Sequence, residues 1–271
     1  MFGLIRTTII ALVLAFNAGS ILAQDFQKGL VAAQSGDYVT ALQEWLPLAD
    51  QGDVMAQFNL ALMYRNGWGV LQDYAEAVKW YRLAAEQGIA EAQSNLALMY
   101  DNGTGVLQDY AEAVKWYRLA AEQGIASAQY NLGVMYDNGT GVLQDDAEAV
   151  KWYRLAAEQG IASAQYNLGV MYDNGTGVLQ DYAEAVKWYR LAAEQGIATS
   201  QNNIGAMYEK GTGVLQDNVR AHMWYNIAAA NGYENSGEWR DQIAAKMTSA
   251  DISKAQSLAR ECMSSNYKNC G

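Results

Sequence analysis

The sequence predicts an all-α protein built as an α-solenoid, because a 36-residue unit recurs along most of the chain. The five copies are residues 53–88, 89–124, 125–160, 161–196 and 197–232. The third and fourth copies differ at one position only, where Asp146 corresponds to Tyr182, and the second differs from the fourth at four positions. A fixed period in this range is typical of stacked helix pairs, each of which buries its apolar faces against its neighbours.

The third copy shows how one unit is expected to form two helices. Its first helix carries an apolar stripe at the spacing of one helical face, formed by Ala128, Leu132, Met135 and Tyr136. We expect this helix to end at Gly139, because glycine just past the last turn readily adopts the left-handed conformation that stops a helix. Val142 and Leu143 follow in the connection, and we expect both to pack beneath the helical hairpin.

The second helix of this unit is expected to run from Ala147 to Gln159. Asp145 and Glu148 before it have the spacing of a capping box, in which each side chain accepts from the other residue's main-chain N–H. Tryptophan recurs at one position of every copy, as Trp80, Trp116, Trp152, Trp188 and Trp224. Such a ladder suits a carbohydrate or cofactor platform, but helical spacing beside alanine favours packing in the core.

The sequence of the repeat resembles a known family. Residues 128–142 read Ala-Gln-Tyr-Asn-Leu-Gly-Val-Met-Tyr-Asp-Asn-Gly-Thr-Gly-Val, and residues 181–196 read Asp-Tyr-Ala-Glu-Ala-Val-Lys-Trp-Tyr-Arg-Leu-Ala-Ala-Glu-Gln-Gly. Together they resemble the Sel1-like repeat, a relative of the tetratricopeptide repeat with a Gly-x-Gly-Val hairpin. The resemblance covers residues 53–232 and implies a right-handed α-solenoid of helix–turn–helix repeats. It also implies a scaffold for protein–protein contacts, of a kind often found in exported bacterial proteins.

The segments outside the repeats predict a leader and two caps. Residues 1–23 combine a charged start, a short apolar stretch and a small-residue end, which is typical of a signal peptide cleaved after Ala23. An uncleaved membrane anchor is the alternative, although about 20 apolar residues are usually needed to span a bilayer. Residues 24–52 and 233–271 are less regular, as expected of helical caps. The sequence therefore predicts a periplasmic or secreted protein, without stable membrane insertion after cleavage.

The composition favours a protein or peptide as the partner. The chain has 29 Asp and Glu residues against 18 Lys and Arg residues, a net charge of −11. Nucleic-acid binding depends on Lys and Arg at the phosphates, so we expect no nucleic-acid partner. An acidic chain suits a basic partner, although acidity also serves solubility alone. The Gly-x-Gly hairpins follow helices and not strands, so we expect no nucleotide cofactor.

The cysteines and the single histidine predict structural roles. Cys262 and Cys270 are the only cysteines, and in an exported protein we expect them to form a disulfide. His222 aligns with a valine in each of the other copies, and we expect it to half-fill a position at the core edge. One histidine without a cluster of further ligands predicts no zinc site, and no metal is expected.

The sequence predicts no catalytic residue, and one motif supports an alternative. Ser265 and Lys268 have the Ser-x-x-Lys spacing of penicillin-binding chemistry, and some cysteine-rich relatives of this family have been discussed as β-lactamases or penicillin binders. The alternative is therefore a cell-envelope protein that binds or hydrolyses β-lactams or peptidoglycan. The chain lacks a Lys-Thr-Gly motif and has no cysteines within its repeats. We therefore predict a scaffold without enzymatic activity.

Positions that vary among the copies predict the binding surface. They are the third, sixth, tenth and thirteenth residues of each copy, all on its first helix, and they fall within an arc of roughly 80° at about 100° per residue. First helices line the concave side of such solenoids, so we expect a partner-binding groove. Its predicted residues are Met55, Phe58, Glu91, Ser94, Ser127, Tyr130, Val134, Asp137, Ser163, Tyr166, Val170, Asp173 and Asn202.

Tyrosine and acidic residues in this groove suit a partner segment that carries Arg or Lys. The alternative is that solvent-exposed positions drift because nothing constrains them. Gln129 and Asn131 belong to the constant set, and we expect both to hydrogen-bond the neighbouring repeat.

Overall fold

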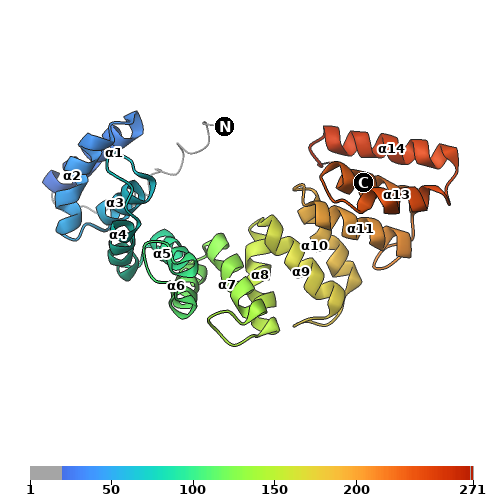
Figure 1. The fold of residues 1–271 in the computed structure, drawn as a ribbon, viewed down its shortest axis with the longest axis horizontal. Coiled ribbons are helices and arrows are strands. Elements are labelled where there is room, and N and C mark those ends of the chain that lie inside the picture. Colours follow the sequence, from blue (N-terminus) through green and yellow to red (C-terminus); the bar gives the residue numbers. More distant parts are fainter. Residues whose placement is uncertain (1–19, 269, 271) are drawn as a thin grey trace. The chain divides into compact units, whose positions relative to one another are not determined.

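The computed structural model describes residues 20–268 and residue 270, with side chains from Phe26 onward, and its regular secondary structure is entirely helical (Figure 1). The predicted signal peptide lies largely in residues 1–19, outside the described residues. The helices are α1 (Ser20–Ser35), α2 (Tyr38–Asp50), α3 (Val54–Asn66), α4 (Tyr74–Glu86), α5 (Ala90–Asn102), α6 (Tyr110–Glu122), α7 (Ala126–Asn138), α8 (Asp146–Glu158), α9 (Ala162–Asn174), α10 (Tyr182–Ala193), α11 (Ala198–Lys210), α12 (Asn218–Ala230), α13 (Ser236–Ala244) and α14 (Ser249–Ser264).

The chain divides into two compact units, residues 1–128 and 129–271, with the division inside α7. In the first unit each helix from α1 to α6 packs on the next one along the chain. In the second unit the same pattern runs from α8 to α12, and both α13 and α14 pack on α12. This order of packing confirms the predicted all-α solenoid of helix pairs with helical caps. Among the helices that the structure describes, none is long and apolar enough to cross a membrane.

Local sequence signals set the helix ends. The Asp145 side chain accepts from the main-chain N–H groups of Ala147 and Glu148, at 3.1 and 3.0 Å, as predicted. The reciprocal half of the capping box is absent, because the N–H of Asp145 donates to the carbonyl of Tyr136 instead. Helix α8 therefore begins one residue earlier than predicted, at Asp146. Gly139 has a φ of 68° and follows the last residue of α7, so the predicted glycine stop is confirmed.

The tryptophan ladder belongs to the core, as predicted. Trp80, Trp152, Trp188 and Trp224 are all buried, and Trp116 is half-buried. Alanines such as Ala149 and Ala156 lie at the same interfaces and are fully buried, which lets the helices approach closely.

The prediction for Leu143 is wrong. Its side chain is 88% exposed, and Val142 beside it is half-buried. The connection there is not helical, and Val142 takes the more buried place in it. The leucines at the same position of the other units are exposed as well, namely Leu71, Leu107, Leu179 and Leu215. Leucine at this position therefore contributes no core area.

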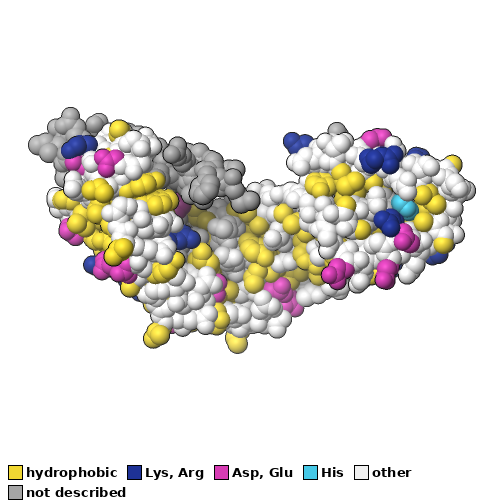
Figure 2. Space-filling view, turned by 45° about the horizontal axis from the view of Figure 1, so that its top comes forward, with side chains coloured by type: hydrophobic (Ala, Val, Ile, Leu, Met, Phe, Trp, Pro, Cys, Tyr) yellow, Lys and Arg dark blue, Asp and Glu magenta, His cyan; other side chains and the backbone are white. Residues whose placement is uncertain are grey.

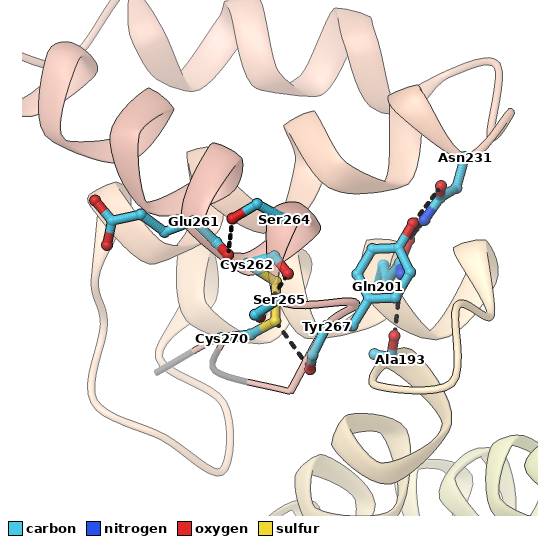
Figure 3. The surroundings of a disulfide bond; sticks show 9 residues. All are labelled: Ala193, Gln201, Asn231, Glu261, Cys262, Ser264, Ser265, Tyr267 and Cys270. Atoms are coloured by element: carbon cyan, nitrogen blue, oxygen red, sulfur yellow. Dashed lines mark hydrogen bonds between the residues drawn. A yellow bond between two sulfur atoms is a disulfide. The ribbon is translucent and has the colours of Figure 1, made fainter.

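The chain after α14 is held by a disulfide and by a hydrogen bond to the last repeat (Figure 3). Thr248 caps α14 through a hydrogen bond from the N–H of Asp251. Cys262 and Cys270 form the predicted disulfide, which holds the chain after α14. Tyr267 in this loop donates to Asn231, which donates in turn to Gln201. The loop thus fastens the end of the chain to the last repeat.

Candidate functional site

The variable positions lie on the first helices of the five repeats. Glu91, Ser127 and Ser163 are exposed, and the following are half-buried: Met55, Phe58, Ser94, Tyr130, Val134, Asp137, Tyr166, Val170 and Asp173. Half-buried side chains of this kind expose part of their surface to solvent. Figure 2 shows apolar side chains spread over the surface of both units, with charged side chains scattered among them.

A cluster of two tyrosines and an aspartate forms the centre of the third repeat. The Tyr130 ring of α7 packs against the Tyr153 ring of α8, with their centroids 6.0 Å apart. The Tyr153 hydroxyl donates to the Asp137 carboxylate at 3.1 Å. Burial, followed by the negative charge of Asp137, raises the pKa of Tyr153 well above its ordinary value. The phenol therefore stays protonated and keeps donating to the carboxylate.

The fourth repeat forms the same cluster. Tyr166 packs on Tyr189 with a centroid distance of 6.1 Å, and the Tyr189 hydroxyl donates to Asp173 at 3.3 Å. We call the half-buried residues Tyr130, Val134, Asp137, Tyr166, Val170 and Asp173 the tyrosine–acid surface. The structure thus brings predicted residues together in two equivalent clusters on successive repeats.

The constant residues join neighbouring repeats, as predicted. Gln165 donates to the carbonyl of Ala157 in the preceding repeat at 3.1 Å, and Gln195 donates to the carbonyl of Gly160 in that repeat at 3.0 Å. Asn95, the equivalent of Asn131, accepts a hydrogen bond from Arg65 of the preceding repeat at 3.0 Å. These side chains therefore form hydrogen bonds within the array.

Comparison of the copies does not single out Tyr153 and Tyr189 as part of the site, because tyrosine recurs at their position in every copy. The ring is indeed buried, but its hydroxyl reaches the acidic side chain at the surface. One sequence signal accompanies this contact. Gly133 faces the ring, and a Cβ there would lie 2.7 Å from Tyr153.

The first unit carries a different version of the surface. Phe58 packs on Tyr81 with a centroid distance of 6.0 Å, and the thirteenth residue is Arg65, which donates to Asn95 at 3.0 Å. In the second repeat burial raises the pKa of Asp101, opposed by a hydrogen bond from Tyr117. The aromatic–acid pattern is therefore complete only in the third and fourth repeats.

Asn202 is the predicted groove residue that the structure corrects. It is buried, and it accepts a hydrogen bond at 2.8 Å from the hydroxyl of Ser236, itself fully buried. Ser236 begins α13, so the C-terminal cap covers the position that would continue the surface. Asn202 therefore seals the end of the array and offers no contact to a partner.

The residues considered for other chemistry have structural surroundings. The Ser265 hydroxyl donates to the carbonyl of Cys262 at 2.8 Å, next to the end of α14, and the Lys268 side chain is exposed. His222 is 2% exposed, more deeply buried than predicted, and burial together with the positive Arg240 lowers its pKa. Among the described residues, no group of three or more His, Cys, Asp or Glu side chains is arranged to hold a metal ion.

The fold and these clusters define a class of protein: an α-solenoid of helix hairpins whose constant residues hold the stack and whose variable residues are mostly half-buried or exposed. The family profile described as the Sel1 repeat matches five segments of the chain, residues 54–89, 90–125, 126–161, 162–197 and 198–233. The chain therefore belongs to the Sel1 repeat family. The profile's units start one residue later than the copies counted above.

Two solved structures are similar over most of the chain. A Sel1 repeat protein from Oxalobacter formigenes is 38% identical with a TM-score of 0.71, over 78% of this chain and 86% of that one. The Escherichia coli protein c5321, described as a protective antigen of uropathogenic strains displaying an SLR fold, is 35% identical with a TM-score of 0.75. That match covers 92% of this chain and 57% of the E. coli chain. A comparison with curated proteins gives no significant match.

Proposed function

We propose that this protein is a non-catalytic scaffold that binds a segment of another protein at the tyrosine–acid surface. Sel1 repeat proteins are in general scaffolds that bind other proteins. The observation that carries the proposal is the pair of equivalent clusters, in which Tyr130 with Asp137 and Tyr166 with Asp173 offer the same contacts on successive repeats. Tyrosine anchors binding well, because its ring has large area and few rotamers.

The acidic groups indicate the chemistry of the partner. Asp137 and Asp173 are half-buried, accept one hydrogen bond each from a protonated tyrosine, and carry the charge of the surface. An Arg or Lys of the partner would complement each carboxylate, while its apolar side chains pack on the tyrosine rings. We therefore infer a segment that bears basic and apolar residues.

The place of action that we propose is the cell envelope or the exterior. The signal-peptide pattern of residues 1–23 and the disulfide between Cys262 and Cys270 support it, because disulfides persist in oxidising compartments. Fractionation of the producing cells tests this part. Recovery of a chain that begins at Gln24 in the periplasm or medium supports export, and a cytoplasmic chain that retains residues 1–23 contradicts it.

Substitution of the anchors tests the binding surface. We expect Tyr130→Ala and Tyr166→Ala to weaken capture of a native partner by about 2 kcal/mol each, roughly 30-fold in Kd, which is the size of a hot-spot contact. The matched control is Tyr182→Asp, because Tyr182 is 39% exposed on α10 and the third repeat already has Asp146 there. The proposal would be contradicted if Tyr130→Ala and Tyr166→Ala captured the partner as well as the wild type and the Tyr182→Asp control do, with unchanged circular dichroism.

A further inference from the structure

Four of the connecting hairpins each rest on the helix pair that precedes them. The second glycine of the hairpin lies against the main chain where the preceding second helix begins. A Cβ at Gly177 would overlap the carbonyl of Asp146 and lie 2.9 Å from the nitrogen of Ala147. Gly213 faces Tyr182 in the same way, and in the first unit Gly69 faces Tyr38 and Gly105 faces Tyr74. Only glycine allows so close an approach.

The C-terminal helix pair lacks this hairpin. Residues 175–181 connect α9 to α10, whereas α13 and α14 are connected by residues 245–248 alone, which contain no glycine. The start of α12 is therefore left without the hairpin that covers the starts of α8 and α10. A cavity of about 300 Å³ lies at this place. It is lined by residues 216–219 on one side and by Lys246, Met247 and Asp251 on the other.

We propose that this cavity is a docking site for a glycine-containing hairpin of a partner protein. Its floor includes Asn218 and Val219, the equivalents of Asp146 and Ala147, which carry the hairpin of the fourth repeat. The proposed ligand therefore has the backbone conformation of the Gly-x-Gly hairpin, which fills the equivalent place on the preceding helix pairs. It continues an interface that the chain already forms between its own repeats.

The charged side chains around the cavity already have partners within the protein. The cavity is therefore expected to recognise the main chain of its partner and not a charged side chain. Lys246 lies 3.8 Å from the Glu209 carboxylate, and the carboxylate of Asp251 accepts from the hydroxyl of Thr248 at 2.8 Å. Asp217 accepts from the N–H of Arg220 as the cap of α12. The partner is therefore defined by a tight turn with glycine at positive φ, followed by an apolar residue as in the chain's own Gly-Val sequence.

The site is separate from the tyrosine–acid surface, which lies on α7 and α9. Four of the chain's five hairpins are already seated within it, so a second copy would have to release one of these four in order to bind through it. A different protein with an unoccupied glycine hairpin does not bear this cost.

The test uses a cyclised peptide with the sequence of residues 174–181, Asn-Gly-Thr-Gly-Val-Leu-Gln-Asp, titrated into the full chain and followed by ¹H–¹⁵N NMR. We expect saturable shifts of the amides of Asn218, Val219 and Met247. The control peptide carries the change Gly177→Ala, and we expect it to bind at least about 10-fold more weakly, since its Cβ would meet the carbonyl. Equal affinity of the two peptides, or no shift at millimolar concentration, would overturn the proposal.

Two variants of the protein distinguish binding at the cavity from a general effect of substitution on the fold. Met247→Trp fills the cavity from the connection and should abolish the shifts, whereas Leu179→Trp, at an exposed leucine of another connection, should leave them unchanged. Peptide binding that survives Met247→Trp in a folded chain counts against the site. If the protein forms a concentration-dependent dimer and Met247→Trp abolishes it, the cavity binds a second copy of this chain and not a different protein. That result would likewise overturn the proposal.

Discussion

Four equivalent tyrosines allow a graded test of the tyrosine–acid hydrogen bond. The donor–acceptor distances are 2.8 Å for Tyr225 and Glu209, 3.1 Å for Tyr153 and Asp137, 3.3 Å for Tyr189 and Asp173, and 3.5 Å for Tyr117 and Asp101. Substitution by phenylalanine keeps the buried ring and removes the hydroxyl alone. The series therefore isolates one hydrogen bond in four nearly identical surroundings.

The expected loss follows from the partners and their exposure. A hydrogen bond to a charged group contributes about 1.5–3 kcal/mol, but the acceptors here are half-buried and regain water when the hydroxyl is removed. We expect Tyr225→Phe to lower the free energy of unfolding by about 1–2 kcal/mol. The loss should shrink with distance, to below about 0.5 kcal/mol for Tyr117→Phe, because 3.5 Å is long for a hydroxyl donor.

Urea unfolding of the full chain, followed by both circular dichroism and tryptophan fluorescence, measures these differences. Repeat arrays unfold in parts, so the two probes must agree before one free energy is assigned. Amide hydrogen exchange in α12 and α8 supplies a local readout if they do not. Equal losses at all four positions, or no loss for Tyr225→Phe, would refute the reasoning and leave ring packing as the only contribution.

Three further predictions concern pH and packing. Burial and Asp137 raise the pKa of Tyr153 above its unfolded value of 10.0, so its stabilising contribution is complete below pH 10 and is lost as the pH rises further. Tyr153→Phe should therefore make the loss of stability at alkaline pH shallower in urea titrations. Burial and Arg240 lower the pKa of His222, so on acidification the unfolded chain takes up this proton before the folded chain does, and stability should fall as the pH drops below 6.5. His222→Val introduces the valine that the other four repeats have at this position and should remove this dependence of stability on pH. Leu132→Ala should cost about 2–5 kcal/mol in urea unfolding since Leu132 is fully buried, whereas Leu143→Ala should change stability by less than about 0.5 kcal/mol.

Much of the fold could be predicted because the same helix caps and glycine stops recur in every repeat. Gly139 ends one helix and Asp145 starts the next through contacts within a few residues, and both were predicted. The candidate site was predictable in part. Tyr130 and Asp137 were found by comparing copies, but their link through Tyr153 was not, since that tyrosine does not vary.

The period, the caps and the apolar stripes determined that this chain forms stacked helix pairs, and the spacing of Cys262 and Cys270 allowed their disulfide to be predicted. These features depend on neighbours in the sequence. Only the tertiary structure decided that Leu143 faces solvent, that α13 buries Asn202, and that the start of α12 keeps an open cavity. Each of these depends on which side chains meet across helices, and a pattern within one repeat does not contain that information.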